Sequence, residues 1–267
     1  MERELDQLVE TIKRAGDRAR ELAERGFEVH RKKDGSPVTT ADFEVNRIFH
    51  EMQQRRFPND GWLSEETPDD PDRLEKTRVW IIDPIDGTKA YVNRLPEYCI
   101  SVALVEYGKP VLAAIFNPSA DELFTAVRGQ GLCLNGKPIT PSPAQMASSL
   151  IMVSSWEFRN GRWAGLDSSL QCRPMLSIAN ALALVAAGRI QATLTIEPEN
   201  EWDLAAGVLL IEEGGGSVSD GEGKPFTFNQ PNPRFRGVIA VSATAGQDVR
   251  PLLQQHADRA RGTKNRS

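Results

Sequence analysis

Two carboxylates, Asp83 and Asp86, stand three residues apart directly after an apolar run at 79–82. The run is rich in β-branched and aromatic residues, which predicts a buried strand, and Pro84 is expected to end that strand at Asp83 because proline cannot donate a ladder hydrogen bond. Two carboxylates held this close resist ionising together unless a cation lies between them, and Mg²⁺ binds carboxylate and phosphate oxygens. The same residues, followed by Gly87, also suit a polar turn, so the stretch alone leaves both interpretations open.

Further acidic residues lie where secondary-structure elements are expected to begin or end. Asp42 falls in the first turn of a helix that should begin at the threonine pair 39–40, and the helix dipole favours a carboxylate there. Glu65 and Glu66 follow a brief predicted strand, and Asp203 opens an apolar helix as an N-cap or its neighbour. Each residue alone has this ordinary explanation, so the case for chemistry rests on the whole set.

The chain before residue 140 predicts two helices and an antiparallel sheet. Apolar residues at three- and four-residue steps indicate a long amphipathic helix that ends near Gly26, and a second helix follows the threonine pair. Residues 31–36 are expected to form a polar, solvated loop, and a role in covering the site is the alternative. Short strands joined by tight turns should form a meander that pairs with strands near 62–64 and 79–82: 99–105, 111–116, 123–127 and 132–134, with a hairpin turn at Asn135-Gly136.

Beyond a Pro-Ser-Pro boundary at 141–143, strands and helices alternate. The strands are expected at 150–153, 190–195, 217–219 and 238–241, and the helices at 178–187, 204–213 and 249–256. This pattern predicts an α/β (α+β) protein in two halves. Residues 1–140 would carry the antiparallel sheet and the acidic motif, and residues 141–267 would form an α/β half that completes the site.

Composition narrows the class of protein. A formal charge of −5 over 267 residues gives no reason to expect binding to a nucleic acid polymer or an anionic membrane. Three cysteines and three dispersed histidines without ligand spacing argue against a zinc site and for reduced thiols, which predicts a cytoplasmic protein. The N-terminal residues are charged, and no apolar stretch is long enough to span a bilayer.

Four sequence blocks taken together resemble the inositol monophosphatase family of Mg²⁺-dependent, lithium-sensitive phosphomonoesterases, which includes 3′(2′),5′-bisphosphate nucleotidases. The blocks are Val-Thr-Thr-Ala-Asp at 38–42, Ser-Glu-Glu at 64–66, Trp-Ile-Ile-Asp-Pro-Ile-Asp-Gly-Thr at 80–88 and Trp-Asp-Leu-Ala-Ala-Gly at 202–207. The third block is highly specific, and the resemblance runs over nearly the whole chain. It implies a layered αβαβα sandwich.

The resemblance also implies two or three Mg²⁺ ions in the site. Their ligands would be acidic side chains and one backbone carbonyl: Glu66, Asp83 and the carbonyl of Ile85 for one ion; Asp83, Asp86 and Asp203 for the second; and Glu65 with Glu66 for a weaker third. Two metals roughly 3.5–4 Å apart can stabilise both ends of an in-line displacement at phosphorus. No protein nucleophile is then needed, in keeping with a sequence that lacks a Gly-x-Ser-x-Gly elbow.

Catalytic roles follow from the same resemblance. Asp42 and Thr88 would orient and activate the attacking water, with Glu66 contributing from the metal site. The backbone N–H groups of Gly87 and Thr88, at a helix start, would bind the phosphate.

The substrate is less well defined by the sequence. Many family members have a Gly-Ser or Gly-Thr pair near the substrate, but Leu176 replaces the glycine before Ser177 here. Ser177, Lys89 and an acid near Glu201 are the candidate substrate contacts, and spacing does not choose among the acids at 197, 199 and 201. Inositol monophosphate is the expected substrate, adenosine 3′,5′-bisphosphate is the alternative, and an inactive metal-dependent binding protein is a third hypothesis. Relatives are often homodimers, so a homodimer is also expected.

Overall fold

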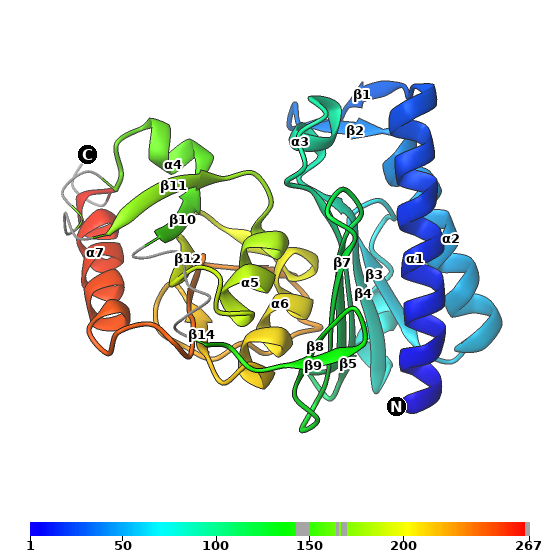
Figure 1. Cartoon of the computed structure of the whole chain (residues 1–267). Helices are drawn as coiled ribbons and strands as arrows, with labels where there is room; N and C mark the ends of the chain where they lie inside the picture. The colour runs from blue at the N-terminus through cyan, green and yellow to red at the C-terminus, as the bar shows by residue number, and fades with distance from the viewer. Residues whose placement is uncertain (143–149, 164–165, 167–169, 265–267) are drawn as a thin grey trace.

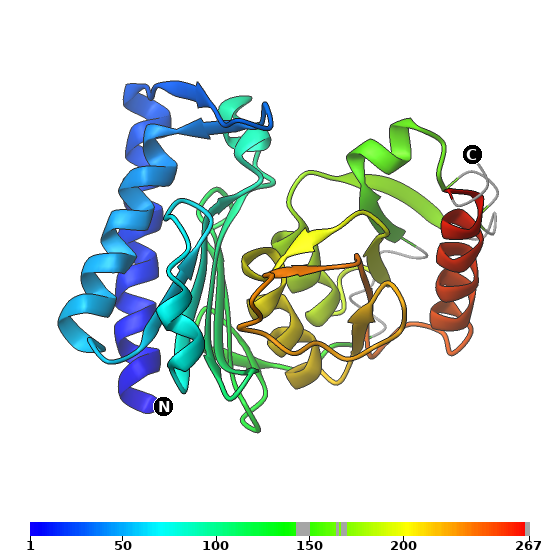
Figure 2. The ribbon, with the colours of Figure 1, turned by 180° about the vertical axis from the view of Figure 1, so that it is seen from behind.

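The computed structural model describes residues 1–142, 150–163, 166 and 170–264. The elements form five layers (Figure 1): helices α1 (Glu2–Arg25) and α2 (Thr40–Arg56), a seven-stranded sheet, helices α5 (Ile178–Ala186) and α6 (Glu201–Glu213), a five-stranded sheet, and helix α7 (Val249–Lys264). Figure 2 shows the same succession from behind. The expected αβαβα sandwich is therefore confirmed.

The first sheet contains the predicted meander. Its strands lie side by side in chain order: β3 (Gly61–Ser64), β4 (Arg78–Asp86), β5 (Cys99–Glu106), β6 (Lys109–Asn117), β7 (Glu122–Val127), β8 (Leu132–Leu134) and β9 (Lys137–Ile139). Only β3 and β4 pair in parallel. The tight turn between β8 and β9 uses Asn135 and Gly136, both with positive φ, as the hairpin signal predicts.

Strand β4 continues past Pro84, so the prediction that it ends at Asp83 was wrong. The pairing with β5 shifts at this point, because Asp83 faces Ser101 whereas Asp86 faces Cys99. Three steps on β4 thus oppose two on β5, which is a bulge. A bulge tolerates proline because the displaced residue needs no ladder bond.

The second sheet has the order β11-β10-β12-β16-β14. Its strands are β10 (Leu150–Ser154), β11 (Gln171–Met175), β12 (Ala192–Thr195), β14 (Ser217–Asp220) and β16 (Val238–Val241). Four of these strands and all three long helices were expected, although α6 begins at Glu201 and α7 extends to Lys264. The expected boundary at 141–143 includes Pro143, which lies outside the described residues.

Several short elements were not predicted. They are β1 (Val29–Arg31) and β2 (Pro37–Thr39), which pair as a hairpin where a loop was expected, α4 (Ser155–Arg159), and the pair β13 (Glu199–Asn200) and β15 (Arg234–Phe235). Two other short elements are η1 (Pro71–Glu75) and α3 (Thr88–Val92), of which α3 begins where the family resemblance implies a helix start. Each is too short to show a hydrophobic period.

Close packing of α5 against α6 fixes the middle layer. A Cβ atom at Gly207 would lie 2.6 Å from the Cβ of Leu182, so only glycine permits this approach. On the other side, the hydroxyl of Ser101 on β5 donates to the carbonyl of Trp202 at 3.2 Å. The start of α6 is therefore held against the end of the large sheet. In the described part of the chain, none of the helices combines the length and apolar character that a membrane span requires.

Candidate metal centre and active site

Asp83 and Asp86 lie on either side of the β4 bulge, and local hydrogen bonds fix both carboxylates. Asp83 Oδ1 accepts the backbone N–H of Ile85 at 3.0 Å. Asp86 Oδ2 accepts the backbone N–H of Ala179 at 2.6 Å and the hydroxyl of Ser177 at 2.5 Å, so the start of α5 holds this side chain. The bulge and α5 together point two acids at one place.

Asp203 reaches the same place from α6. One carboxylate oxygen from each of Asp83, Asp86 and Asp203 lies within 4.8 Å of the others, and Asp83 and Asp203 are buried. Three oxygen ligands at this spacing suit a hard divalent cation. The sequence analysis requires acids from both halves of the chain to meet, and Asp203 does lie beside Asp83 and Asp86.

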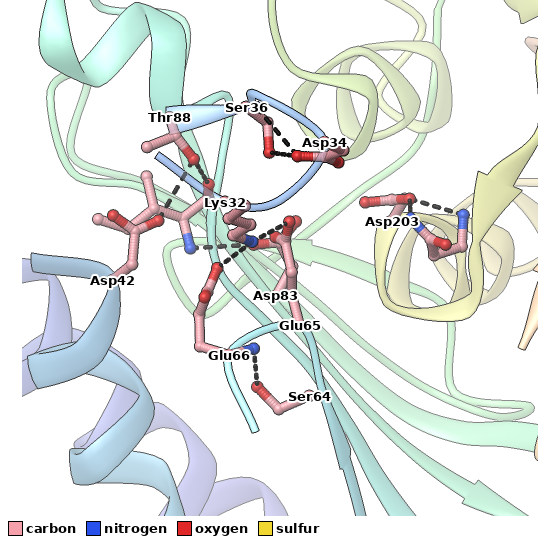
Figure 3. A network of polar contacts seen from close by, with 12 residues as sticks. Lys32, Asp34, Ser36, Asp42, Ser64, Glu65, Glu66, Asp83, Thr88 and Asp203 are labelled. Atoms are coloured by element: carbon pink, nitrogen blue, oxygen red, sulfur yellow. Dashed lines mark hydrogen bonds and ion pairs between the residues drawn. The ribbon is translucent and has the colours of Figure 1, made fainter. Parts of the chain in front are cut away.

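Asp42 and Asp203 occupy the same position in two capping boxes. Asp42 Oδ2 accepts the N–H and the hydroxyl of Thr39 at the start of α2, and Asp203 Oδ2 accepts the N–H and the side-chain amide of Asn200 at the start of α6. Asp42 Oδ1 accepts the hydroxyl of Thr88 at 3.3 Å (Figure 3). The helix-cap interpretation of both aspartates is therefore correct, and each keeps a second oxygen directed to the site.

Glu65 and Glu66 follow β3 and share a cation from the chain itself. The ammonium of Lys32 donates to Glu65 Oε1 at 2.7 Å and to Glu66 Oε1 at 2.6 Å, beside Asp83 and Asp42 (Figure 3). The loop between β1 and β2 carries Lys32, so this segment covers the acids and the prediction of a solvated loop was wrong. No local pattern relates residue 32 to residues 65 and 66, and this contact could not be found from spacing.

Burial and mutual repulsion raise the pKa values of these acids. Burial raises the pKa of Asp42 and of Asp86 to about 6 and that of Glu66 to about 7. Burial, with repulsion from neighbouring carboxylates, raises the pKa of Asp83 and of Asp203 well above the ordinary range. Such a cluster needs a compensating cation to be fully ionised at neutral pH.

The acidic side chains also shift the pKa of Lys32, which carries the opposite charge. Burial works against its ammonium, but Glu65 and Glu66 outweigh that effect and raise its pKa.

Two of the three expected substrate contacts have other partners. The hydroxyl of Ser177 is buried and donates to Asp86, so Ser177 orients that acid. Glu201 is fully buried, and its two carboxylate oxygens accept the N–H groups of Asn229 and Gln230 at 2.7 and 2.8 Å, which removes it from the site. Glu199, which spacing could not single out, instead lines a pocket together with Asp86 and the third candidate, Lys89.

Comparison with known proteins agrees with this geometry. Residues 1–255 match the model of the "Inositol monophosphatase family". The chain is 33% identical to inositol monophosphatase 3 of Solanum lycopersicum, in an alignment that covers 85% of this chain and 89% of that protein. It is 31% identical to the 3′(2′),5′-bisphosphate nucleotidase CysQ of Escherichia coli, in an alignment that covers 87% of this chain and 98% of that protein. The structure of a Thermotoga maritima IMPase superposes with a TM-score of 0.84 at 27% identity, covering 98% of this chain and 99% of that one.

Proposed function

The chain belongs to the inositol monophosphatase family of phosphatases, and we propose that it hydrolyses a small phosphate monoester with Mg²⁺ bound to Asp83, Asp86 and Asp203. The convergence of these three carboxylates, at most 4.8 Å apart, carries the proposal. Burial and mutual repulsion raise the pKa values of these acids, and a bound divalent cation would stabilise their ionised forms.

Further ligands would come from Glu66 and the carbonyl of Ile85. When bound, Mg²⁺ supplies positive charge that favours ionisation of water and stabilises the phosphate. Lys32 already holds Glu65 and Glu66, so a third cation would have to compete with its ammonium for these two acids.

Asp42 and Thr88 are suited to orient the attacking water. The Thr88 hydroxyl has a single proton and lies near two acceptors, Asp42 Oδ1 at 3.3 Å and the carbonyl of Ile85 at 3.1 Å. When it donates to the carbonyl, Asp42 Oδ1 is able to accept a proton from water instead. The bond from Thr39 to the other oxygen keeps Asp42 in position during that exchange.

Gly87 and Thr88 would bind the phosphate through their backbone N–H groups at the start of α3. Gly87 has φ 88°, which favours glycine, and a Cβ atom there would lie 3.0 Å from the carbonyl oxygen of Glu97 and 3.1 Å from the Cβ of Ser177. The backbone conformation that would present these N–H groups therefore requires glycine at position 87.

The substrate has two candidates. Inositol monophosphate is the first, since relatives named as inositol monophosphatases are 32–33% identical to the chain. A 3′-phosphonucleotide is the second, since the CysQ nucleotidase is 31% identical and Lys89 lines the pocket beside Asp86, where it could meet a second phosphate.

A phosphate-release assay tests the proposal. Inositol 1-phosphate, adenosine 3′,5′-bisphosphate and glycerol 2-phosphate are incubated with the purified protein and Mg²⁺, with EDTA, or with added Li⁺. We expect release that requires Mg²⁺ and that Li⁺ inhibits. Asp83→Asn should lower release by more than about 10³-fold with an unchanged circular dichroism spectrum.

Asp60→Asn is the matched control, because Asp60 is a partly buried acid that accepts the indole N–H of Trp80 away from the site. It should retain activity. Failure to release phosphate from every ester at saturating Mg²⁺ would overturn the proposal and favour a metal-dependent binding protein. Near-wild-type activity of Asp83→Asn would also contradict it.

A further inference from the structure

A pocket of about 470 Å³ extends from Asp86 at the proposed metal centre to helix α4. Trp156 and Arg159 of α4 line one side of this pocket, and Glu199 lines another. The volume is in the range of small-molecule sites, so the pocket can hold the leaving group of a phosphate ester that is bound at the three aspartates. The shape of the pocket therefore depends on how α4 is held relative to Glu199.

Helix α4 has five residues, which is too few for a helix to be stable on its own. The side chain of Glu157, in the middle of this helix, is fully buried and does not line the pocket. Burying a carboxylate costs free energy unless its oxygens accept hydrogen bonds. The partners of Glu157 are therefore the contacts that keep α4 in place.

Both carboxylate oxygens of Glu157 accept hydrogen bonds. Oε1 accepts the backbone N–H of Ile196 at 2.7 Å, the backbone N–H of Glu197 at 3.0 Å and the hydroxyl of Thr195 at 3.0 Å. Oε2 accepts the indole N–H of Trp163 at 2.9 Å. Three of these four donors lie at the end of β12 or directly after it, so Glu157 joins α4 to this segment of the chain.

The same segment leads to Glu199, and its far end is fixed independently. Glu199 pairs with Phe235 in the short β13–β15 sheet, and the N–H of Glu201 donates to the carbonyl of Pro233 at 2.9 Å. Glu157 thus connects α4 to a segment that is already held at its other end. One buried carboxylate therefore fixes the two sides of the pocket relative to each other.

A different contact fixes the start of α4. The hydroxyl of Ser155 donates to the carbonyl of Met175, the last residue of β11. Because this bond lies at the first helical residue, the direction of the helix has to be set by a second contact, and Glu157 supplies it. The placement of the pocket-lining side chains of α4 therefore depends on Glu157.

We propose that Glu157 is a positioning residue for substrate selection, which holds the α4 side of the pocket in place relative to Glu199 without contacting the substrate. The inference rests on the proposed phosphatase function. The metal centre should not depend on Glu157, since Asp203 is fixed by its own cap and by the contacts of Glu201. Loss of Glu157 should therefore weaken binding of the leaving group and leave binding of phosphate and Mg²⁺ unchanged.

Glu157→Gln is the test variant because it keeps the shape of the side chain. The four partners of the carboxylate in the described part of the chain all donate, whereas an amide has one accepting oxygen and one donating NH₂ group. Whichever way the amide turns, its NH₂ group faces a donor, so at least one anchor is lost. Leu253→Ala is the structural control, since Leu253 of α7 is fully buried in the same hydrophobic cluster as Trp163 and its truncation removes no hydrogen bond of Glu157.

The assay measures KM and kcat at saturating Mg²⁺ for inositol 1-phosphate and adenosine 3′,5′-bisphosphate, the inhibition constant of inorganic phosphate, and the Mg²⁺ concentration for half-maximal activity. For Glu157→Gln we expect the KM of at least one ester to rise about 10-fold and kcat to change by less than about 3-fold. The phosphate and Mg²⁺ constants should match wild type. Leu253→Ala should lower the melting temperature and leave all of these constants unchanged.

A double-mutant cycle tests whether Glu157 acts through α4. Trp156→Ala combined with Arg159→Gln changes the two long pocket-lining side chains of this helix and should raise the same KM. Adding Glu157→Gln to this variant should raise that KM by less than about 2-fold more, because the side chains that Glu157 positions are already altered. If Glu157→Gln does not fold, Trp163→Phe replaces it, because it keeps a ring in the core, removes one donor from Glu157 and should raise the same KM about 3-fold.

Four outcomes would each overturn the positioning role: an unchanged KM in the folded variant, an equal rise in the inhibition constant of phosphate, additive effects in the cycle, or the same change of KM in Leu253→Ala. Absence of turnover with every ester would instead refute the phosphatase proposal. Titration calorimetry with inositol 1-phosphate and Mg²⁺ then decides the positioning role. Binding that Glu157→Gln weakens and Leu253→Ala does not would support it, and unchanged or absent binding would refute it.

Discussion

Helices α2 and α6 begin with the same local device, a capping box whose third helical residue is an aspartate. In both, one carboxylate oxygen accepts the N–H of the N-cap residue at 2.7 Å. The second oxygen of Asp42 meets the hydroxyl of Thr88, whereas Asp203 joins two other aspartates. The same local motif therefore places an acid in two different surroundings, which suit the two roles proposed above.

The comparison teaches that capping and function are compatible interpretations of one residue. A carboxylate has two oxygens, and the cap bond uses one of them while also fixing the direction of the other. The two helix starts differ in their surroundings: Asp42 belongs to the same half as Asp83, whereas Asp203 must be brought there from the other half. Substitutions can separate the cap from the chemistry at each helix start.

The largest effect is expected at Asp203. Asp203→Asn keeps an oxygen that can accept the N–H of Asn200, but it removes a negative charge from the proposed metal site. We expect kcat/KM at millimolar Mg²⁺ to fall roughly 10³-fold, the Mg²⁺ concentration for half-maximal activity to rise at least about 10-fold, and the melting temperature to change little. Steady-state assays over a Mg²⁺ series and a thermal melt measure these quantities.

The matched variant is Asp203→Ala, which removes the cap bond as well. It should show the same catalytic loss and, in addition, a free energy of unfolding lower by about 1 kcal/mol. Wild-type Mg²⁺ dependence in Asp203→Asn would show that this aspartate is only a cap.

A smaller and different effect is expected at Asp42. Asp42→Asn should lower kcat by about 10²-fold, because the proposed base that accepts the proton from water is lost, while half-maximal Mg²⁺ stays as in wild type. Thr88→Val removes the partner of Asp42, and the double variant should be hardly slower than Asp42→Asn alone, since the two act as a unit. Additive losses would contradict the shared role, and a raised Mg²⁺ requirement would make Asp42 a metal ligand.

Much of the fold could be predicted because its long elements are locally encoded. The spacing of apolar residues predicted helices α1 and α2, and the Asn135-Gly136 pair predicted the hairpin between β8 and β9. The bulge in β4 could not be predicted, since Pro84 argues for a strand end and only pairing with β5 shows how the ladder passes it. Short α4 and β11 lack a period, and Pro174 lies inside the latter.

The residues of the site also fall into those that could be predicted from the sequence and those that could not. Its acids could be predicted because each lies in a local motif at an element end. The contact of Lys32 could not be predicted, and spacing could not single out Glu199 from its neighbouring acids, since both depend on contacts or pocket walls made by residues distant in the chain. Glu201 shows the converse error: it lies two residues from Asp203, yet its carboxylate is turned to a buried loop.

That buried contact of Glu201 belongs to a tether between the two halves. Arg73 of η1 is almost fully buried and donates to Asn229 Oδ1 at 2.7 Å and to the carbonyl of Gln230 at 3.0 Å. The N–H groups of Asn229 and Gln230 in turn donate to Glu201, in the first turn of α6. The tether thus fixes the helix start that carries Asp203, an arrangement that Asp42 does not need.

The smallest effect is expected from loosening this tether. Arg73→Lys keeps the positive charge but loses the planar fork that reaches both loop residues. We expect about a 3- to 10-fold higher Mg²⁺ concentration for half-maximal activity, with kcat at saturating Mg²⁺ near wild type, because Asp203 would be displaced while still present. Arg78→Gln is the control, since Arg78 pairs with Glu4 and Asp60 within the first half. If Arg73→Lys and Arg78→Gln both lower the melting temperature and neither changes the Mg²⁺ dependence, Arg73 stabilises the fold without positioning Asp203, and the two helix starts need no separate support.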